Sequence, residues 1–152
     1  MDSALTDTIA LARSLPLYPG MMVTSEAEKK LLQKFVALAS LVPVLAGLDG
    51  VLAGARMLGG GPGVMDSHFR YLSGLLLAIG VTFICTIPRI ESHGRRFRLL
   101  TAIVVTGGVG RLLGVLITGV FDAIVLFALV MELVVTPALC AWQYRVALRI
   151  SG

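Results

Sequence analysis

Charged residues are scarce in this sequence. They make up 14% of its 152 residues, against roughly a quarter in a typical soluble domain. Hydrophobic residues make up 57%, and the mean hydropathy is +0.90. A soluble domain of this length cannot bury so much apolar surface. The composition therefore excludes a water-soluble globular protein and indicates an integral membrane protein.

Cysteine and histidine are also rare, which argues against metal and redox chemistry. Cys85 and Cys140 match neither a metal-binding spacing nor a CxxC motif, so we expect two reduced thiols. One histidine beside a carboxylate is a poor metal site, and no nucleophile has an obvious base. The glycine-rich stretch 54–65 lacks the Lys-Ser/Thr signature of a phosphate loop. We therefore expect no catalytic residue, no metal and no cofactor.

The net charge of +4 does not indicate nucleic-acid binding, because the basic residues flank apolar runs and form no patch interleaved with aromatic residues. Most of them fall on one side of the predicted spans, and Arg56 is the exception. That side holds Lys29, Lys30, Lys34, the arginines of the stretch 89–98, Arg145 and Arg149. The positive-inside rule places it, with both chain termini, in the cytoplasm.

Four apolar runs predict an all-α, polytopic membrane bundle of four helices. We expect these helices at about 25–52, 67–87, 99–120 and 123–142. Ser25 and Glu28 have the spacing of a capping box, and Asp66 or Ser67 supplies the second N-cap. Pro43 predicts a bend in the first helix and Pro88 ends the second. The domains expected are an N-terminal segment 1–24, the transmembrane domain 25–146 and a tail 147–152.

The N-terminal segment allows three interpretations. Residues 2–15 have the spacing of a short amphipathic helix, with Leu5 and Ile9 on its apolar face, but the segment suits disorder equally well. Alternatively, translation begins at Met21 or Met22, and residues 1–20 do not belong to the native protein.

Arg111 is the central charge of the third predicted helix, within the run GGVGRLLG of residues 107–114. A charge at this depth costs about 2.5–3.5 kcal/mol on insertion scales, so it requires a partner. At the rise of an α-helix, Arg111 lies roughly 18 Å from the cytoplasmic end of its helix, and Glu132 lies roughly 15 Å from the same end of the next. A tight turn joins the two helices. We therefore predict an ion pair between Arg111 and Glu132. Pro137 frees the carbonyl of Leu133 beside it, which favours a hydrated pocket.

A second polar layer is expected nearer the outer face. Asp49 and Arg70 each lie roughly 27 Å from the cytoplasmic ends of their helices, and His68 and Asp66 lie just beyond. Two interpretations of the polar layers remain open. They hold the helices in register, or they line a polar cavity that opens to the outer side.

Several short motifs together carry a resemblance to a known family. They are DSHFRYLSG at 66–74, PRIE at 88–91, RLL at 98–100, GGVGRLL at 107–113, and Glu132 with Pro137. With these motifs, residues 31–145 resemble a bacterial family of small four-helix membrane proteins that is known only as a domain of unknown function. The resemblance implies an inner-membrane protein and no particular activity.

Three functions remain open at this point. In the first, the bundle binds or moves a small amphiphilic ligand. Arg111 then meets an anionic or carbonyl group of the ligand, and Glu132 sets the orientation of Arg111. In the second, the protein is an accessory subunit whose glycine faces pack against a second copy or another membrane protein. The third and weakest is a membrane enzyme built around His68, Asp66 and Arg70. Membrane lipid is a partner in all three.

Overall fold

The computed structural model describes residues 19–55 and 63–151, and every regular element in this part of the chain is a helix. Its helices are α2 (Pro19–Ala53), α3 (Gly63–Thr86), η2 (Ile87–Arg89), α4 (Gly94–Thr118), α5 (Ala123–Val130), the π-helical η3 (Met131–Val135) and α6 (Thr136–Ser151). The last three follow one another without interruption, so the described residues form four helical spans. Each span is long and apolar enough to cross a membrane. The predicted all-α fold with four spanning helices is therefore confirmed.

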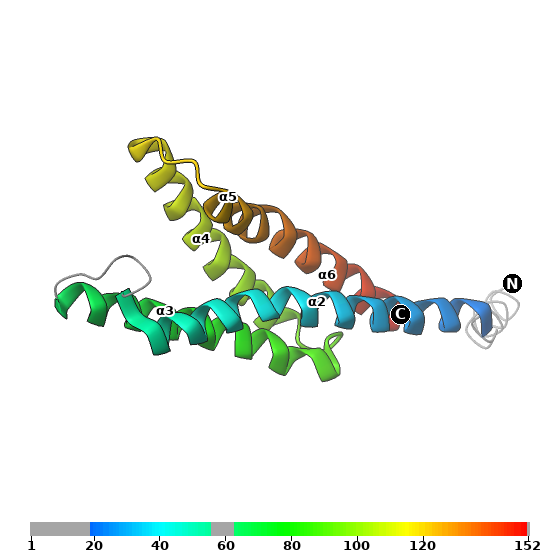
Figure 1. Ribbon diagram of the computed structural model, residues 1–152. Coiled ribbons are helices and arrows are strands. Elements are labelled where there is room, and N and C mark those ends of the chain that lie inside the picture. The colour runs from blue at the N-terminus through cyan, green and yellow to red at the C-terminus, as the bar shows by residue number, and fades with distance from the viewer. Residues whose placement is uncertain (1–18, 56–62, 152) are drawn as a thin grey trace, which may run out of the picture.

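The four spans form two hairpins. α2 packs along α3, and α4 packs against η3 and α6. Figure 1 shows that the two hairpins come together at the end where α6 finishes and diverge toward the turn between α4 and α5. We call the end that contains η2, the start of α4 and the last turns of α6 the closed end. The opposite end, with the α4–α5 turn and the last turns of α2, is the open end.

The buried core lies at the closed end. Its members are Leu32, Val36, Phe83, Ile90, Phe97, Leu100 and Val146. The rings of Phe83 and Phe97 meet edge to face, with centroids 5.1 Å apart. Gln143 is fully buried here, and its amide donates a hydrogen bond to the carbonyl of Ile90 at 2.8 Å. All four spans and the η2 turn are therefore fixed to one another at this end.

The outward surface of the spans is apolar. Leu52, Ile117 and Ile124 are each more than 70% exposed, and large aliphatic side chains like them cover all four spans. A continuous apolar surface of this extent is far beyond what a soluble monomer exposes. It is the surface that a bilayer covers.

Close contact between α2 and α3 depends on small residues. A Cβ added at Gly47 would lie 2.5 Å from the backbone nitrogen of Leu77, and one at Gly50 would lie 2.2 Å from the hydroxyl of Ser73. Only glycine lets the two helices approach this closely. Gly54, with φ of +62°, then ends α2 in a left-handed conformation that favours glycine.

Two predicted helix starts are wrong. α2 begins at Pro19, so Ser25 lies inside the helix and is not an N-cap. Proline is favoured in the first turn, where its missing N–H removes no helical hydrogen bond. α3 begins at Gly63, so Asp66 and Ser67 also lie inside a helix. The amphipathic helix expected at residues 2–15 lies outside the described residues.

Candidate functional site: an ion pair beside an apolar groove

Arg111 and Glu132 form a bidentate ion pair between α4 and η3. The Nε of Arg111 donates to Oε2 of Glu132, and its Nη2 donates to Oε1, each at 3.0 Å. Parallel N–H···O bonds of this kind fix the orientation of both side chains. The side chain of Arg111 is 40% exposed, and that of Glu132 is 18% exposed. The structure thus brings together the two residues that the sequence predicted to pair because they lie at a similar depth.

Gly108 lets α4 come close enough to η3 for this pair to form. A Cβ added at Gly108 would lie 2.9 Å from Cβ of Glu132 and 2.8 Å from Cδ2 of Leu133. Neither contact is tolerable for a larger residue without a shift of the helix. Arg111 follows three residues later, which places it on the same side of α4 and within reach of the carboxylate.

A π-helical turn positions Glu132, which is its second residue. The backbone N–H of Thr136 bonds to the carbonyl of Met131, five residues earlier, and the Thr136 hydroxyl donates to the same carbonyl at 2.8 Å. Pro137 has no N–H, so a regular bond to Leu133 cannot form there. The hydroxyl of Thr136 bonds to the carbonyl of Met131 and not to that of Leu133. Isolated π-turns of this kind occur frequently at functional sites.

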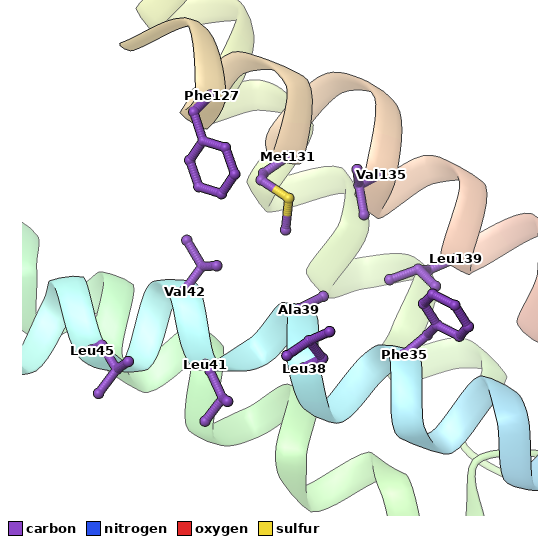
Figure 2. Close-up of a pocket in the computed structure, with 10 residues that line it drawn as sticks. All are labelled: Phe35, Leu38, Ala39, Leu41, Val42, Leu45, Phe127, Met131, Val135 and Leu139. Atoms are coloured by element: carbon purple, nitrogen blue, oxygen red, sulfur yellow. The ribbon is translucent and has the colours of Figure 1, made fainter. Parts of the chain in front are cut away.

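A groove of about 430 Å³ lies between α2 and the fourth span. Figure 2 shows Val42 on α2 pointing across it toward Phe127 and Met131 of the fourth span. The α2 wall consists of Phe35, Leu38, Ala39, Leu41, Val42 and Leu45, and the opposite wall consists of Phe127, Met131, Val135 and Leu139. Every lining residue is apolar, in contrast to the polar cavity that the sequence suggested. The volume falls within the range of about 300–1,000 Å³ that is common for ligand sites.

The ion pair and the groove share the π-helical turn η3. Met131 and Val135, at its two ends, line the groove, while Glu132 between them holds Arg111. Arg111 uses only its Nε and Nη2 for the pair, and within the described residues its Nη1 has no partner. Arg111 also lies eleven residues after the core residue Leu100, and this spacing places both on one face of α4. Because the hairpins diverge beyond Leu100, that face is open where it carries Arg111.

Asp66 and Arg70 form a separate cluster that caps α2. Nε of Arg70 donates to Oδ2 of Asp66 at 2.7 Å, and its Nη1 donates to the carbonyls of Val51 and Leu52. Oδ1 of Asp66 accepts a hydrogen bond at 2.8 Å from the backbone N–H of Ala55. A cation at the last carbonyls of a helix also interacts favourably with the helix dipole. This cluster therefore has a structural role in closing the α2–α3 hairpin.

The structure does not bring Asp49 or His68 to this cluster. Both are exposed, and among the described residues neither side chain has a hydrogen-bond or ion-pair partner. In these same residues no group of three His, Cys, Asp or Glu side chains is arranged to hold a metal ion. Cys85 and Cys140 are both free thiols.

At the closed end the sequence did not single out Gln143, and it assigned Glu28 only to a capping box. Glu28 accepts a hydrogen bond from Nε1 of Trp142 at 3.1 Å and pairs with Arg149, and Gln143 bonds across to Ile90. The position of Gln143 in the sequence could have revealed it, because an amide that directly follows an apolar run needs a hydrogen-bond partner when it is buried.

Four apolar spans that cover a small core, with a charged pair held between two of them, define a multi-pass helical membrane protein. The model of the family described as "Domain of unknown function (DUF4345)" matches residues 31–143. The chain belongs to this family. The comparison with curated proteins found no match, and the comparison with solved structures found none either.

Proposed function

We propose that the protein binds an amphiphile inside the membrane. The acyl chain lies in the apolar groove, and an oxygen of the head group accepts hydrogen bonds from Arg111. Glu132 orients the guanidinium. The observation that carries this proposal is the π-helical turn, which places Met131 and Val135 in the groove and Glu132 on Arg111.

The dimensions of the groove suit a single chain. Met131 and Leu139 are eight residues apart, which corresponds to about 12 Å along a helix. This part of the groove runs from the level of the ion pair to the level of Phe35, at its closed end, and Phe127 lines a further turn toward the open end. Phe35 lies against Trp142, with ring centroids 5.7 Å apart. An acyl chain anchored at Arg111 then extends toward Trp142.

Trp142 is the single tryptophan of the chain, so its fluorescence reports on this end of the groove. The experiment is a titration of the full-length protein in mild detergent with phosphatidylethanolamine brominated near the ends of its acyl chains. Bromine quenches indole fluorescence at short range. We expect quenching that saturates at a low mole fraction of the brominated lipid.

Ala39→Phe is the test variant, because Ala39 lines the groove and a phenyl ring would fill it. The matched control is Ala102→Phe on the exposed face of α4. We expect Ala39→Phe to weaken the apparent affinity at least about tenfold and Ala102→Phe to leave it unchanged. Quenching that rises linearly with lipid in all three proteins would show ordinary annular lipid and overturn the proposal.

A second candidate function is that of an accessory subunit, and one observation favours it. Gly107, Gly110 and Gly114 fall on one side of α4, and a Cβ added at any of them would meet nothing within 4 Å among the described residues. Small residues at this spacing allow another membrane helix to approach closely. Gly110→Leu should then abolish crosslinking to a partner or a second copy in native membranes while leaving lipid quenching intact.

We further propose that the closed end faces the cytoplasm of a bacterial inner membrane. Lys29, Glu91 and Arg149 lie at this end, and the arginines of the stretch 89–98 surround the η2 turn. The excess of lysine and arginine supports this orientation. Reporter fusions at the two termini should both give the cytoplasmic signal, and an external signal from either would contradict the orientation.

A further inference from the structure

Exposed basic side chains without partners surround the closed end, and we call them the basic belt. Its seven members are Lys30, Lys34, Arg89, Arg95, Arg96, Arg98 and Arg145. Among the described residues, none of these side chains forms a hydrogen bond or an ion pair. The acidic side chains at this end do not balance the belt. Glu28 already pairs with Arg149. Glu91 pairs with Lys29, which leaves Glu26. The closed end therefore carries a large uncompensated positive charge.

Contacts between the elements place the basic belt at one level of the bundle. Lys29 of α2 lies 3.1 Å from Glu91, and the amide of Gln143 in α6 donates to the carbonyl of Ile90 at 2.8 Å. A Cβ added at Gly94 would lie 3.4 Å from the same amide. Each member of the belt lies within five residues of one of these contacts in the sequence, which corresponds to at most about 7.5 Å along a helix. The belt thus draws its residues from α2, η2, α4 and α6 at a similar depth.

The arginines at the start of α4 do not stabilise that helix. Arg95, Arg96 and Arg98 follow its first residue closely, and the first turn holds no acidic residue. His93 precedes the helix and forms no side-chain cap. Cations are unfavourable near the positive end of the helix dipole, and neighbouring arginines also repel one another. An anion from outside the chain would offset both effects.

Two aromatic side chains lie at the level of the belt. Trp142 and Tyr144 flank Gln143, and Tyr144 is 52% exposed. Tryptophan and tyrosine are enriched where a membrane protein crosses the head-group layer. A plane of lipid phosphates meets all sides of a bundle at one depth, which matches charges contributed by several helices. A soluble acidic partner would instead require charges gathered on a single face.

From these observations we infer that the basic belt binds anionic phospholipid head groups in the leaflet that meets the closed end. A guanidinium can donate two parallel hydrogen bonds to phosphate oxygens. The phosphate of phosphatidylglycerol keeps an uncompensated negative charge, whereas that of phosphatidylcholine is neutralised by its own ammonium group. This binding is separate from the acyl-chain site proposed above, because the lining of the groove is entirely apolar.

The experiment compares phosphatidylglycerol and phosphatidylcholine that have identical acyl chains. The full-length protein in neutral detergent is mixed with equal amounts of both lipids, and native mass spectrometry measures how much of each the protein retains. We expect phosphatidylglycerol to be retained at least about fivefold over phosphatidylcholine. Ala39→Phe, whose groove is filled, should show the same preference, because lipid in the groove no longer contributes.

The test variant combines Arg95→Gln, Arg96→Gln and Arg98→Gln. Its matched control carries lysine at the same three positions and so keeps the charge. The glutamine variant should retain a preference of about twofold or less, whereas the lysine variant should retain most of the original preference. In lipid-free detergent the glutamine variant should unfold at the same temperature as the unaltered protein or at a higher one, since the replaced charges are unfavourable there. Added phosphatidylglycerol should raise the unfolding temperature of the unaltered protein more than that of the glutamine variant.

Five results would overturn the inference. One is equal retention of the two lipids by the unaltered protein. Another is a preference that persists in the glutamine variant. A third is a lower unfolding temperature of that variant without lipid, which would mean that the arginines pair within the protein. A fourth is loss of the preference when inorganic phosphate replaces chloride at equal ionic strength, which would identify a site for free phosphate. The last is loss of the preference in Ala39→Phe, which would assign the selectivity to the groove. In the first four cases, saturable quenching of Trp142 that Ala39→Phe abolishes would leave the acyl-chain site intact, so the two proposals can fail separately.

Discussion

The closed and open ends of this bundle are built on different principles. At the closed end, all four spans share one buried core, and amides and carboxylates join elements that are distant in sequence, as Gln143 does with Ile90 and Lys29 with Glu91. At the open end, Asp66 and Arg70 close one hairpin, and in the other Asp122 caps the start of α5. The side chain of Asp122 caps α5 by accepting from the N–H of Ile124 at 3.0 Å.

This difference means that the closed end holds the bundle together, whereas the open end can change its shape. The tertiary contacts between the two hairpins are concentrated at the closed end. The hairpins can therefore diverge at the open end without losing these contacts. The ion pair of Arg111 and Glu132 joins helices within one hairpin and not across the groove. The groove can therefore change its width without breaking that pair. Each prediction below tests whether the two ends differ in this way.

The largest expected effect is the loss of a ring from the closed-end core. Phe97 is 1% exposed and packs against Phe83, whereas Phe121, at the open end, is 66% exposed. Phe97→Ala should lower the free energy of unfolding by about 3–5 kcal/mol, because the ring leaves a cavity. Phe121→Ala should change it by less than about 0.5 kcal/mol. Unfolding in detergent with increasing denaturant measures both. Similar losses for the two variants would mean that the ends are equally structured.

A double-mutant cycle on Arg111 and Glu132 addresses the open end directly. Arg111→Ala or Glu132→Ala alone leaves one charge without its partner, and we expect each to cost about 3 kcal/mol or less, since water and snorkelling relieve part of the penalty. The double variant should be less destabilised than the worse single variant, because no orphan charge remains. Thermal unfolding of all four proteins supplies the coupling energy.

The same four proteins also separate folding from binding. If the pair orients the head group, the double variant should fold and yet lose saturable quenching of Trp142. Strictly additive losses in the cycle would show that the two residues are not coupled. Retained quenching in the double variant would assign the pair a purely structural role.

The four spans and the central ion pair could be predicted from the sequence because their determinants are local or strongly constrained. Long apolar runs leave few alternatives to membrane helices. For Arg111 and Glu132, the short turn from Gly119 to Asp122 makes the two helices antiparallel neighbours, so matched depth is nearly sufficient for contact. The bidentate geometry, by contrast, depends on Gly108 and the π-turn, which depth alone does not reveal.

The other polar layer shows why depth is insufficient in general. Helix rise gives the level of a residue, but contact also requires that two side chains point toward each other. Asp49 and Arg70 were matched in level, yet Arg70 binds the last carbonyls of α2 and does not pair with Asp49. The pattern at Ser25 and Glu28 failed for a related reason. The spacing of a capping box is the same inside a long helix as at its start. Here Glu28 lies inside α2 and accepts a hydrogen bond from Trp142.

A smaller effect is expected for the buried amide of the closed end. Gln143→Leu keeps the size of the side chain but removes the donor to the carbonyl of Ile90, which is then buried without a partner. The expected loss in the free energy of unfolding is about 1–3 kcal/mol. Gln33 donates to the carbonyl of Ile87 at 2.7 Å from a half-buried position, so Gln33→Leu should cost less. The reverse order would mean that the Gln143 bond contributes little to the closed end.

The smallest effect is a pH dependence at the turn that joins the two hairpins. Burial alone raises the pKa of Glu91, but its own backbone amide, the hydrogen bond and charge of Lys29, and the charge of His93 outweigh it, so the pKa lies below the ordinary value of 4.5. Lys29 and Glu91 are 3.1 Å apart, and their side chains are 18% and 24% exposed. A carboxyl whose pKa is lower in the folded state stabilises that state above its unfolded pKa and ceases to do so as the pH falls through the folded value.

We therefore expect the free energy of unfolding of the unaltered protein to exceed that of Glu91→Gln at neutral pH. The difference should be less than about 1 kcal/mol, because both side chains of the pair are partly exposed to water. The difference should shrink as the pH is lowered below about 4.5, as protonation of Glu91 removes the charge that pairs with Lys29. Unfolding curves of both proteins between neutral pH and about pH 3 measure this, with Glu26→Gln as the control whose curve should run parallel to that of the unaltered protein. A difference that stays constant over this range would show that Glu91 contributes through packing and not through its charge. The link between the hairpins at the closed end would then rest on the core and on Gln143.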